Sequence, residues 1–270
     1  MLNDEDLNLL AQYVRSIFCI NKKYKDNKTP EFIGSGFLLK EQDNLYLITA
    51  AHVVDHYEVE HSLLLDGDNG HLVAISGNSI CSPLENIERK YDKIDISVVK
   101  LSDETQAKLQ STKFFELKHL DVIDEHDPKL GYCVVGIPNN RGNERINRNE
   151  EFISPDPYSF YAEESNLETY EKMGVTKSTN LILRFNSKKV CSREDEKRVA
   201  PSLRGLSGAP VFGFKNKSES EIEVEPVPFI VAVLIEHHQK GINAVLTTKI
   251  CKALSLKNEF HMGQPQSRQQ

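Results

Sequence analysis

The sequence predicts an all-β fold with a short helix near each end. Many short apolar runs are separated by turn residues, whereas few stretches carry the spacing of a helix. Many short strands and few helices are typical of a β-sandwich or a β-barrel. The 270 residues are enough for one large all-β unit of two lobes or for two modest domains.

The two helices are predicted at the ends of this series of strands. Residues 3–13 place acidic side chains in a first turn after Asn3 or Asp4, the candidate caps, and continue with apolar residues at helical spacing. Residues 241–260 indicate a last strand that passes into an amphipathic helix. The polar residues 259–270 have nothing to bury, so we expect a disordered tail there.

The strand candidates lie between these helices. Each is a short apolar run, rich in Val, Ile, Leu or Phe, with turn residues at its ends. No internal repeat is visible among them. In chain order they are 14–20, 34–40, 44–50, 61–65, 71–77, 95–101, 131–138, 180–186, 209–214 and 228–236.

One long polar segment, 139–178, interrupts this rhythm. It contains a single helical candidate, 165–173, which Gly174 would end. Such a long stretch with so few apolar runs is uncommon inside a compact domain. We therefore predict that 139–178 is an insertion that is mobile or functional.

Composition and charge bear on the class of partner. Hydrophobic residues make up 39% and charged residues 27% of the chain, and the formal net charge is −7, so we predict a soluble acidic protein that does not bind nucleic acid. Residues 1–20 carry acidic side chains where a secretory signal carries basic ones, so no signal peptide is expected. No segment approaches the roughly 18 uninterrupted apolar residues of a membrane-spanning helix, so no membrane partner is expected.

The cysteines favour a reducing compartment. Cys19, Cys81, Cys133, Cys191 and Cys251 are odd in number, widely scattered and never arranged as Cys-x-x-Cys. Reduced thiols are the simplest account, and we expect a cytoplasmic protein. Cys133 and Cys191 have no nucleophile context and are predicted to be small buried hydrophobic residues.

Three polar residues at the edges of apolar runs are the candidates for chemistry. His52 follows "LYLITAA", Asp95 opens "DISVVKL", and Ser207 lies in "RGLSGAPVF". Each is weak evidence alone, because a lone histidine is more often a satisfied core or surface residue and a lone aspartate is usually a turn residue. The small residues around Ser207 allow a tight turn that aims backbone N–H groups at one point, where an oxyanion could be held.

Together these residue types can perform acyl transfer. A serine hydroxyl is a poor nucleophile at neutral pH, so a nearby base must take its proton. That base in turn needs a carboxylate to fix its tautomer and stabilise its positive charge. The chain order His52, Asp95, Ser207 is also the order found in chymotrypsin-type proteases.

The segments around these residues resemble the trypsin-like serine peptidases of the chymotrypsin fold. The resemblance covers about residues 30–255 and is stronger to the bacterial, intracellular or HtrA-like branches than to the secreted digestive enzymes. The segments that carry it are "GSGFLLK" with "LYLITAAHVV" for the histidine, "DISVVKL" for the aspartate, "GYCVVGIP" for the start of the second barrel, "GLSGAPVF" for the nucleophile and "GINAVLTTKICKAL" for the last strand and helix.

The resemblance implies a domain organisation. It implies two six-stranded antiparallel β-barrels within one peptidase domain at residues 1–258. The first barrel would occupy about 14–125 and carry the histidine and the aspartate. The second would occupy about 126–250 and carry the serine.

The resemblance also implies the roles of the site residues. His52 would be the general base and then the general acid, Asp95 would orient it, and Ser207 would be the nucleophile. The backbone N–H groups of Gly205 and Ser207 would form the oxyanion hole. Asp92 is the rival for Asp95, but we prefer Asp95 because it stands at the strand start, and we expect Asp92 to be a solvated turn residue.

Two positions depart from the digestive enzymes. The aspartate that pairs with a new N-terminus after zymogen cleavage is replaced by Leu206, so activation by that salt bridge is not expected. Ala209 replaces the second glycine of the nucleophile motif and is small enough to keep the turn. In consequence, the oxyanion hole needs packing, or another trigger, to become ordered.

The specificity pocket is predicted from the same resemblance. Pro201 would line one wall and the strand after the nucleophile, with Leu234 and Ile235, the other. Neither wall is charged, which favours an uncharged substrate residue before the scissile bond. Glu236 could receive a basic side chain, although a glutamate at a strand end is more often solvated.

Other chemistry finds little support in the sequence. His52 and His56 are four residues apart, but "HVVDH" lacks the glutamate of His-Glu-x-x-His and no third ligand is evident, so neither a metal nor a cofactor is predicted. Two hypotheses remain. The first is a serine endopeptidase acting on protein or peptide substrates, with narrow specificity or an activating protein partner. The second is a latent or inactive peptide-binding module on the same fold.

Overall fold

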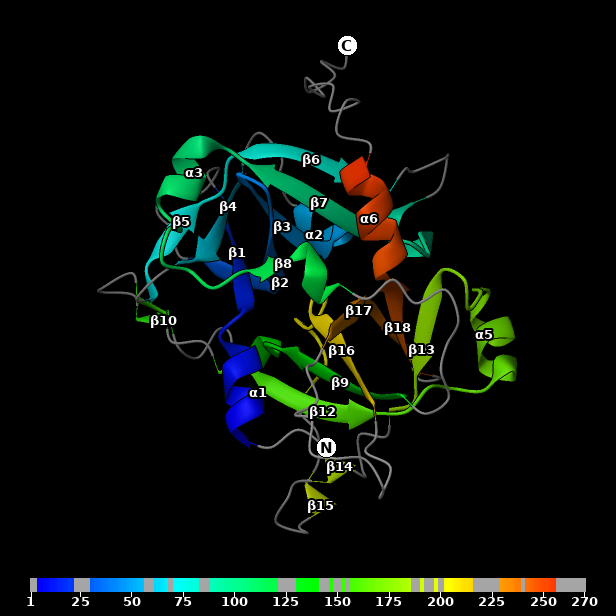
Figure 1. Ribbon diagram of the computed structural model, residues 1–270. Helices are drawn as coiled ribbons and strands as arrows, with labels where there is room; N and C mark the ends of the chain where they lie inside the picture. The colour runs from blue at the N-terminus through cyan, green and yellow to red at the C-terminus, as the bar shows by residue number, and fades with distance from the viewer. Residues whose placement is uncertain are drawn as a thin grey trace.

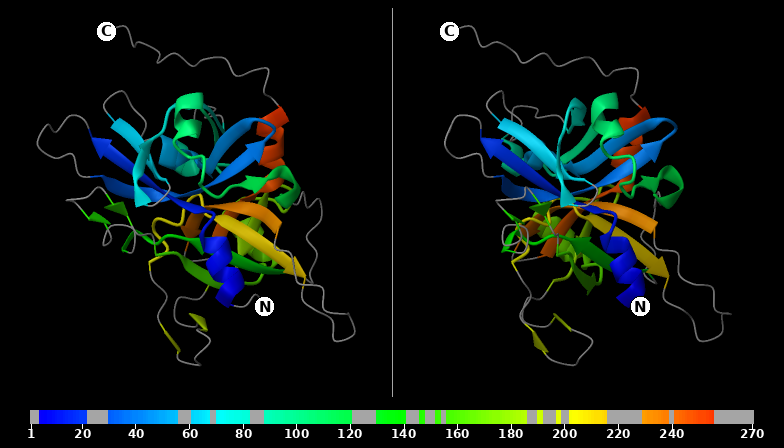
Figure 2. Two further views of the ribbon diagram at one scale, coloured as in Figure 1. Left: turned by 60° about the vertical axis from the view of Figure 1, so that its left-hand side comes forward. Right: turned by 90° about the vertical axis from the view of Figure 1, so that its left-hand side faces the viewer.

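The protein is built from two curled, mainly antiparallel β-sheets, one above the other in the computed structural model (Figure 1). The two sheets stay on opposite sides of the molecule in the turned views of Figure 2. The structure describes residues 4–21, 30–55, 61–67, 70–82, 88–120, 130–140, 146–147, 152–153, 156–185, 190–191, 197–198, 202–215, 229–238 and 241–255.

The first sheet comes from the N-terminal half of the chain. Its strands pair in the order β5-β4-β1-β2-β3-β7-β6, all antiparallel, and the short β8 adds a parallel pair with β2. Their bounds are β1 Val14–Asn21, β2 Glu31–Glu41, β3 Asn44–Ala50, β4 His61–Asp66, β5 Leu72–Ala74, β6 Gly77–Cys81, β7 Ile96–Leu101 and β8 Phe115–Glu116.

The second sheet has six strands, all antiparallel, in the order β12-β9-β16-β17-β18-β13. Its strands are β9 Leu130–Gly136, β12 Tyr158–Ala162, β13 Asn180–Leu183, β16 Pro210–Lys215, β17 Phe229–His238 and β18 Gly241–Leu246. Two short hairpins stand apart from it, namely β10 Ile146–Asn147 with β11 Phe152–Ile153, and β14 Val190–Cys191 with β15 Lys197–Arg198.

The two terminal helices link the sheets. Helix α1 (Asp4–Ala11) precedes the first sheet but packs against β9 of the second, and α6 (Thr247–Ser255) follows the second sheet but packs against β7 of the first (Figure 1). The other helices are α2 Ala51–Val54, α3 Asp103–Ala107, α5 Leu167–Met173 and the 3-10 turns η2 Arg89–Tyr91 and η3 Leu117–His119. Within the part of the chain that the structure describes, every helix is too short or too polar to cross a membrane.

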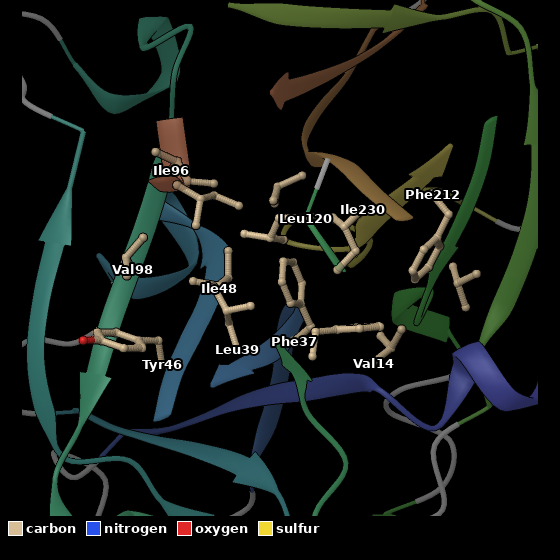
Figure 3. Packing of buried hydrophobic residues seen from close by; sticks show 14 of the residues in the cluster. Val14, Phe37, Leu39, Tyr46, Ile48, Ile96, Val98, Leu120, Phe212 and Ile230 are labelled. Atoms are coloured by element: carbon tan, nitrogen blue, oxygen red, sulfur yellow. The ribbon is translucent and has the colours of Figure 1, made fainter. Parts of the chain in front are cut away.

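The largest hydrophobic core runs through both sheets. Phe37 and Ile48 of the first sheet belong to the same cluster of buried residues as Phe212 and Ile230 of the second, and Figure 3 shows these side chains in one continuous group. All four are 0% exposed, and burying a side chain of this size contributes roughly 1.5–3 kcal/mol. This shared core holds the two sheets in one unit.

The predicted fold class is confirmed, with two differences. The first sheet has eight strands instead of six, because the run 71–77 divides between β5 and β6 and the two-residue β8 joins β2. Part of 139–178 is also a sheet element and not an insertion, since β12 pairs with β9 along its whole length.

The helix predicted at 165–173 is α5, which Gly174 ends in a left-handed conformation. The tail predicted at 259–270 lies outside the described residues.

A buried ion pair joins two strands of the first sheet. Asp66 on β4 is 2% exposed, and its Oδ1 accepts a hydrogen bond from the backbone N–H of Ser16 on β1. Its Oδ2 lies 3.9 Å from Nη1 of Arg15. Burial raises the pKa of Asp66 to about 7, against the opposing effects of Arg15 and of the Ser16 N–H.

This shift makes the stability of the protein depend on pH. Between about pH 4 and pH 7 the folded protein binds a proton at Asp66 that the unfolded chain has released, so each unit of rising pH costs up to about 1.4 kcal/mol. Urea unfolding of the wild type and of Asp66→Asn should therefore show the wild type losing stability relative to the variant across this interval. Glu171→Gln, at an exposed carboxyl, is the control; parallel pH profiles for wild type and Asp66→Asn would contradict the prediction.

Candidate active site

The three candidate residues come from different elements and meet at one pocket. His52 lies in α2 directly after β3, Asp95 directly precedes β7, and Ser207 lies in the turn before β16. Strands β3 and β7 pair with Ala50 opposite Ile96, which brings the histidine and the aspartate together. The pocket has a volume of about 630 Å³ and is lined by His52, Asp55, Arg89, Lys90, Asp92, Asp95, Leu203, Arg204, Ser207, Leu234 and Ile235.

His52 and Asp95 are joined by two hydrogen bonds. Nδ1 of His52 lies 2.6 Å from Oδ2 of Asp95, and the backbone N–H of His52 donates to Oδ1 at 2.9 Å. Because a carboxylate accepts and does not donate, this contact places the ring proton on Nδ1 and leaves Nε2 as the basic nitrogen. Burial raises the pKa of Asp95, and the contacts with His52 oppose that rise.

The backbone of Asp95 takes an uncommon conformation at this point. Its φ angle is 35°, in the left-handed region that non-glycine residues seldom adopt. The carbonyl of Asp95 accepts a hydrogen bond from the N–H of Ala51 at 2.8 Å. Together with the two hydrogen bonds to His52, this contact holds the Asp95 carboxylate next to the imidazole. The strained backbone conformation of Asp95 thus accompanies the His52–Asp95 contact.

Asp92, the rival of Asp95, is not a solvated turn residue. It is 8% exposed, and its carboxylate accepts from Ser82 Oγ, from the N–H of Ile94 at 2.9 Å and from Nη1 of Arg89 at 2.8 Å. These contacts lower the pKa of Asp92 in spite of the burial that opposes them. Sequence position alone could not reveal this role, because Arg89 and Ile94 are near in sequence but Ser82 reaches Asp92 only through the pairing of β6 with β7.

Ser207 is partly buried in a turn that two glycines make possible. Gly205 and Gly208 have φ angles of 92° and 90°. A Cβ at Gly208 would lie 1.9 Å from the backbone oxygen of Ser35, so only glycine fits there. The hydroxyl of Ser207 donates to the carbonyl of Ile235 at 3.4 Å and makes no hydrogen bond with His52 in this structure. Ser207 therefore lines the pocket without a hydrogen bond to His52.

The backbone N–H groups of Gly205 and Ser207 are available to an oxyanion. Neither has an acceptor among the described residues, whereas the N–H groups of Leu206 and Gly208 donate to Leu203 and Leu234. The carbonyl at the other end of each peptide unit is fixed by a hydrogen bond. The carbonyl of Arg204 accepts from the N–H of Asn139 at 2.7 Å, and the carbonyl of Leu206 accepts from the N–H of Ala209 at 2.9 Å. In a trans peptide the N–H points away from the carbonyl, so these bonds orient both donors.

Leu206, which we expected in place of the activation aspartate of the digestive enzymes, directly precedes Ser207. It is 0% exposed and belongs to the apolar cluster of the second sheet. A Cβ at Gly136 would lie 2.6 Å from its Cδ2, which shows how closely it packs against β9. Apolar packing of Leu206 therefore anchors the turn in place of an ion pair.

Ser35 on β2 connects the first sheet to this turn, a role that the sequence does not predict. Its Oγ donates to the carbonyl of Gly205 at 2.8 Å and accepts from the N–H of Ile137 at 3.1 Å. Its own N–H donates to the carbonyl of Ser207 at 2.8 Å. The only signal in the sequence was a serine between two glycines, "GSG", at the start of the predicted strand 34–40.

The predicted specificity residues are described in part. Leu234 and Ile235 line the pocket and are 1% and 2% exposed, so they form its floor. Glu236 belongs to β17, but its side chain lies outside the described part of the structure, and so does the whole of Pro201. Leu203 completes the apolar floor and was missed, because no apolar pattern marks a single leucine inside a loop.

Comparison with known structures shows the fold. A scabies mite inactivated protease paralogue, S-D1, is similar to this chain with a TM-score of 0.52 and 12% sequence identity over 92% of both chains. No family model and no curated protein matches the sequence. At this identity the likeness shows the fold alone, and the fold is the chymotrypsin-like double β-barrel of the trypsin-like proteases.

Removing the Ser35 hydroxyl tests its place in this site. Ser35→Ala removes the group that Ile137 N–H and Gly205 C=O both use, so we expect a loss of roughly 1–3 kcal/mol in the free energy of unfolding. Ser16→Ala is the matched control, because Ser16 pairs with Ser35 across β1 and β2, is also 0% exposed, and its hydroxyl has no hydrogen-bond partner among the described residues. Urea unfolding should leave Ser16→Ala as stable as the wild type or more so; equal losses in both variants would refute the prediction.

Proposed function

We propose that this protein is a serine endopeptidase that hydrolyses peptide bonds of protein substrates through Ser207, His52 and Asp95. The observation that carries the proposal is the 2.6 Å contact between His52 Nδ1 and Asp95 Oδ2 in the pocket that Ser207 lines. A protein that only folds in this way has no need of a buried carboxylate under a half-exposed imidazole at the mouth of a pocket.

The geometry supports an acyl-enzyme mechanism in two steps. In the first, Ser207 Oγ turns from the Ile235 carbonyl to Nε2 of His52, gives up its proton and attacks the substrate carbonyl. The negative charge that forms on the substrate oxygen is stabilised by the N–H groups of Gly205 and Ser207. His52 then passes the proton to the leaving amine, and in the second step it activates a water molecule that hydrolyses the ester. Asp95 stabilises the imidazolium in both steps.

The finer assignments are part of the same proposal. The apolar floor made by Leu203, Leu234 and Ile235 supports an uncharged side chain before the scissile bond. We propose a reducing, cytoplasmic location because Cys19, Cys81 and Cys133 are free thiols, and burial raises the pKa of each. A branch close to the bacterial HtrA-like peptidases, with narrow specificity or an activating partner, rests on the sequence motifs.

A second candidate function is a latent or inactive peptide-binding module on the same fold. Two observations favour it. The structural neighbour described above is an inactivated protease paralogue. The Ser207 hydroxyl is also directed to the Ile235 carbonyl and not to His52. Catalytic hydrogen bonds are often unformed before substrate binds, so the orientation of the Ser207 hydroxyl is also compatible with a peptidase.

A fluorophosphonate probe distinguishes the two functions. The purified protein is incubated with the probe and read by intact mass and peptide mapping. An active site should be labelled at Ser207, and Ser207→Ala should abolish the adduct, since it removes the only atom that reacts. His52→Ala should slow labelling by roughly 1,000-fold or more, because the base is lost.

Controls separate a missing triad from a misfolded variant. Ser202→Ala, at an exposed serine in the same loop, should label at the wild-type rate. Circular dichroism should show each variant folded. Absence of labelling in the wild type, with peptides still bound by the folded protein, would reject the peptidase and support the binding module.

A further inference from the structure

One guanidinium touches both segments that carry the histidine and the aspartate. Nε of Arg89 donates to Oδ2 of Asp55 at 2.7 Å, and Nη2 donates to Oδ1 of the same carboxylate at 3.3 Å. Nη1 donates to Oδ2 of Asp92 at 2.8 Å. Asp55 ends the helical turn three residues after His52, and Asp92 lies three residues before Asp95. The guanidinium therefore spans the two sides of the His52–Asp95 contact.

The contacts on the aspartate side fix a turn. Asp92 accepts from the N–H of Ile94 at 2.9 Å, which closes the turn that leads into Asp95. Nη1 of Arg89 also donates to the carbonyl of Ser82 at 2.9 Å, beyond the end of β6. The left-handed φ of 35° at Asp95 needs such support, because a non-glycine residue adopts this conformation only when its surroundings hold it there.

The charges around this guanidinium are unequal. Arg89 faces three carboxylates, because its Nε also lies 4.0 Å from Oδ1 of Asp95. The Arg89 side chain is 14% exposed, and those of Asp92 and Asp95 are 7% and 8% exposed. Without the guanidinium, two buried carboxylates and the half-exposed one of Asp55 would repel each other across the contact that holds His52.

We propose that Arg89 is a positioning residue that clamps α2 to the turn before β7 and so sets the geometry of the His52–Asp95 pair. The catalytic consequence rests on the proposed peptidase function, whereas the clamp itself does not. An arginine is needed because its planar fork holds Asp55 through two nitrogens while a third reaches Asp92. A lysine ammonium on a flexible stem cannot hold both sides in one geometry.

The neighbouring residue provides a matched control. Lys90 belongs to the same 3-10 turn and lines the same pocket, but its side chain is 60% exposed, and its Nζ lies 2.6 Å from Glu88 and over the ring of Tyr91. Lys90→Met removes the same charge from the same rim without touching α2 or Asp92. A difference between Arg89→Met and Lys90→Met therefore reports the clamp and not the loss of a positive charge.

The first experiment measures the rate of labelling of Ser207 by the fluorophosphonate probe. Arg89→Met should slow labelling by roughly 100-fold, the size of effect expected when a catalytic group is misplaced by about 1 Å. Arg89→Lys should recover part of that loss, and Arg89→Met should be labelled at least roughly 30-fold more slowly than Lys90→Met, which removes the same charge. Labelling of Arg89→Met at the wild-type rate would overturn the proposal.

The acid side of the pH profile gives a readout that loss of packing would not move. The groups facing the Asp95 carboxylate are His52 from α2 and Arg89 from η2, with Asp55 and Asp92 bound to that guanidinium and the Cys81 thiol of β6 near it. Arg89 lowers the pKa of Asp95, so its removal raises that pKa further. As the pH is lowered, Arg89→Met should therefore lose activity at a higher pH than Lys90→Met does. An acid limb at the same pH in both variants would contradict the proposal.

The second experiment does not depend on reactivity. In the wild type, the N–H groups of Ala51 and His52 donate to Asp95, so hydrogen exchange in this segment should be slow. Arg89→Met should exchange there at least roughly tenfold faster, while Lys90→Met and the distant β16 should not change. Equal protection from hydrogen exchange in Arg89→Met and the wild type would refute the clamp, even if no variant reacted with the probe. If the wild type is protected from exchange but never labelled, only the peptidase function is rejected.

A milder variant guards against loss of the fold. Asp55→Asn removes the α2 end of the clamp at a side chain that is 41% exposed and leaves Asp92 paired with Arg89. This variant should slow labelling of Ser207 by roughly tenfold and speed hydrogen exchange at residues 51–55. The double variant Asp55→Asn/Arg89→Met should be no slower than Arg89→Met alone, because both changes break one link. Fully additive effects would contradict a single clamp.

Discussion

The candidate site depends on the attachment of the turn that carries Ser207 to the first sheet. Ser35 on β2 donates its backbone N–H to the carbonyl of Ser207 and its hydroxyl to the carbonyl of Gly205. Thr49 on β3 in turn donates to the carbonyl of Ser35 at 2.7 Å, so the contact is tied into two strands. Because the serine belongs to one sheet and the histidine and aspartate to the other, any slip between the sheets would separate them. The core shared by both sheets and the two crossing helices resist such a slip.

Electrostatics sets the second constraint on the pocket. Three carboxylates lie around the His52 imidazole and the Arg89 guanidinium, and burial raises the pKa of Asp95 while hydrogen bonds lower that of Asp92. The pKa values of two aspartates three residues apart are thus shifted in opposite directions. One carboxylate faces the imidazole, and the other is satisfied by Ser82, Ile94 and Arg89. Arrangements of this kind, in which neighbouring carboxylates differ in pKa, are typical of functional sites.

Most strands of the fold could be predicted because each is a short run with its own turn residues. Strands β3 and β7 are short apolar runs that are buried at nearly every position, and turn residues stand near their ends, so their local pattern is sufficient. Strand β12 was not predicted because "YSFYA" lies in a polar segment, and its strand conformation depends on pairing with β9. The parallel pair of β8 with β2 is two residues long, so it has no pattern to detect.

The sequence by itself determined the all-β class, the terminal helices and the identity of the candidate residues His52, Asp95 and Ser207. It could do so because strand periodicity and the motifs around these residues are local along the chain. Only the tertiary structure decided that Asp92 is buried, that Ser35 holds the nucleophile turn, and that Arg89 spans α2 and the turn before β7. These three roles depend on partners that are distant in sequence or on burial, and a side chain's partners are set by packing of the sheets and not by its neighbours along the chain.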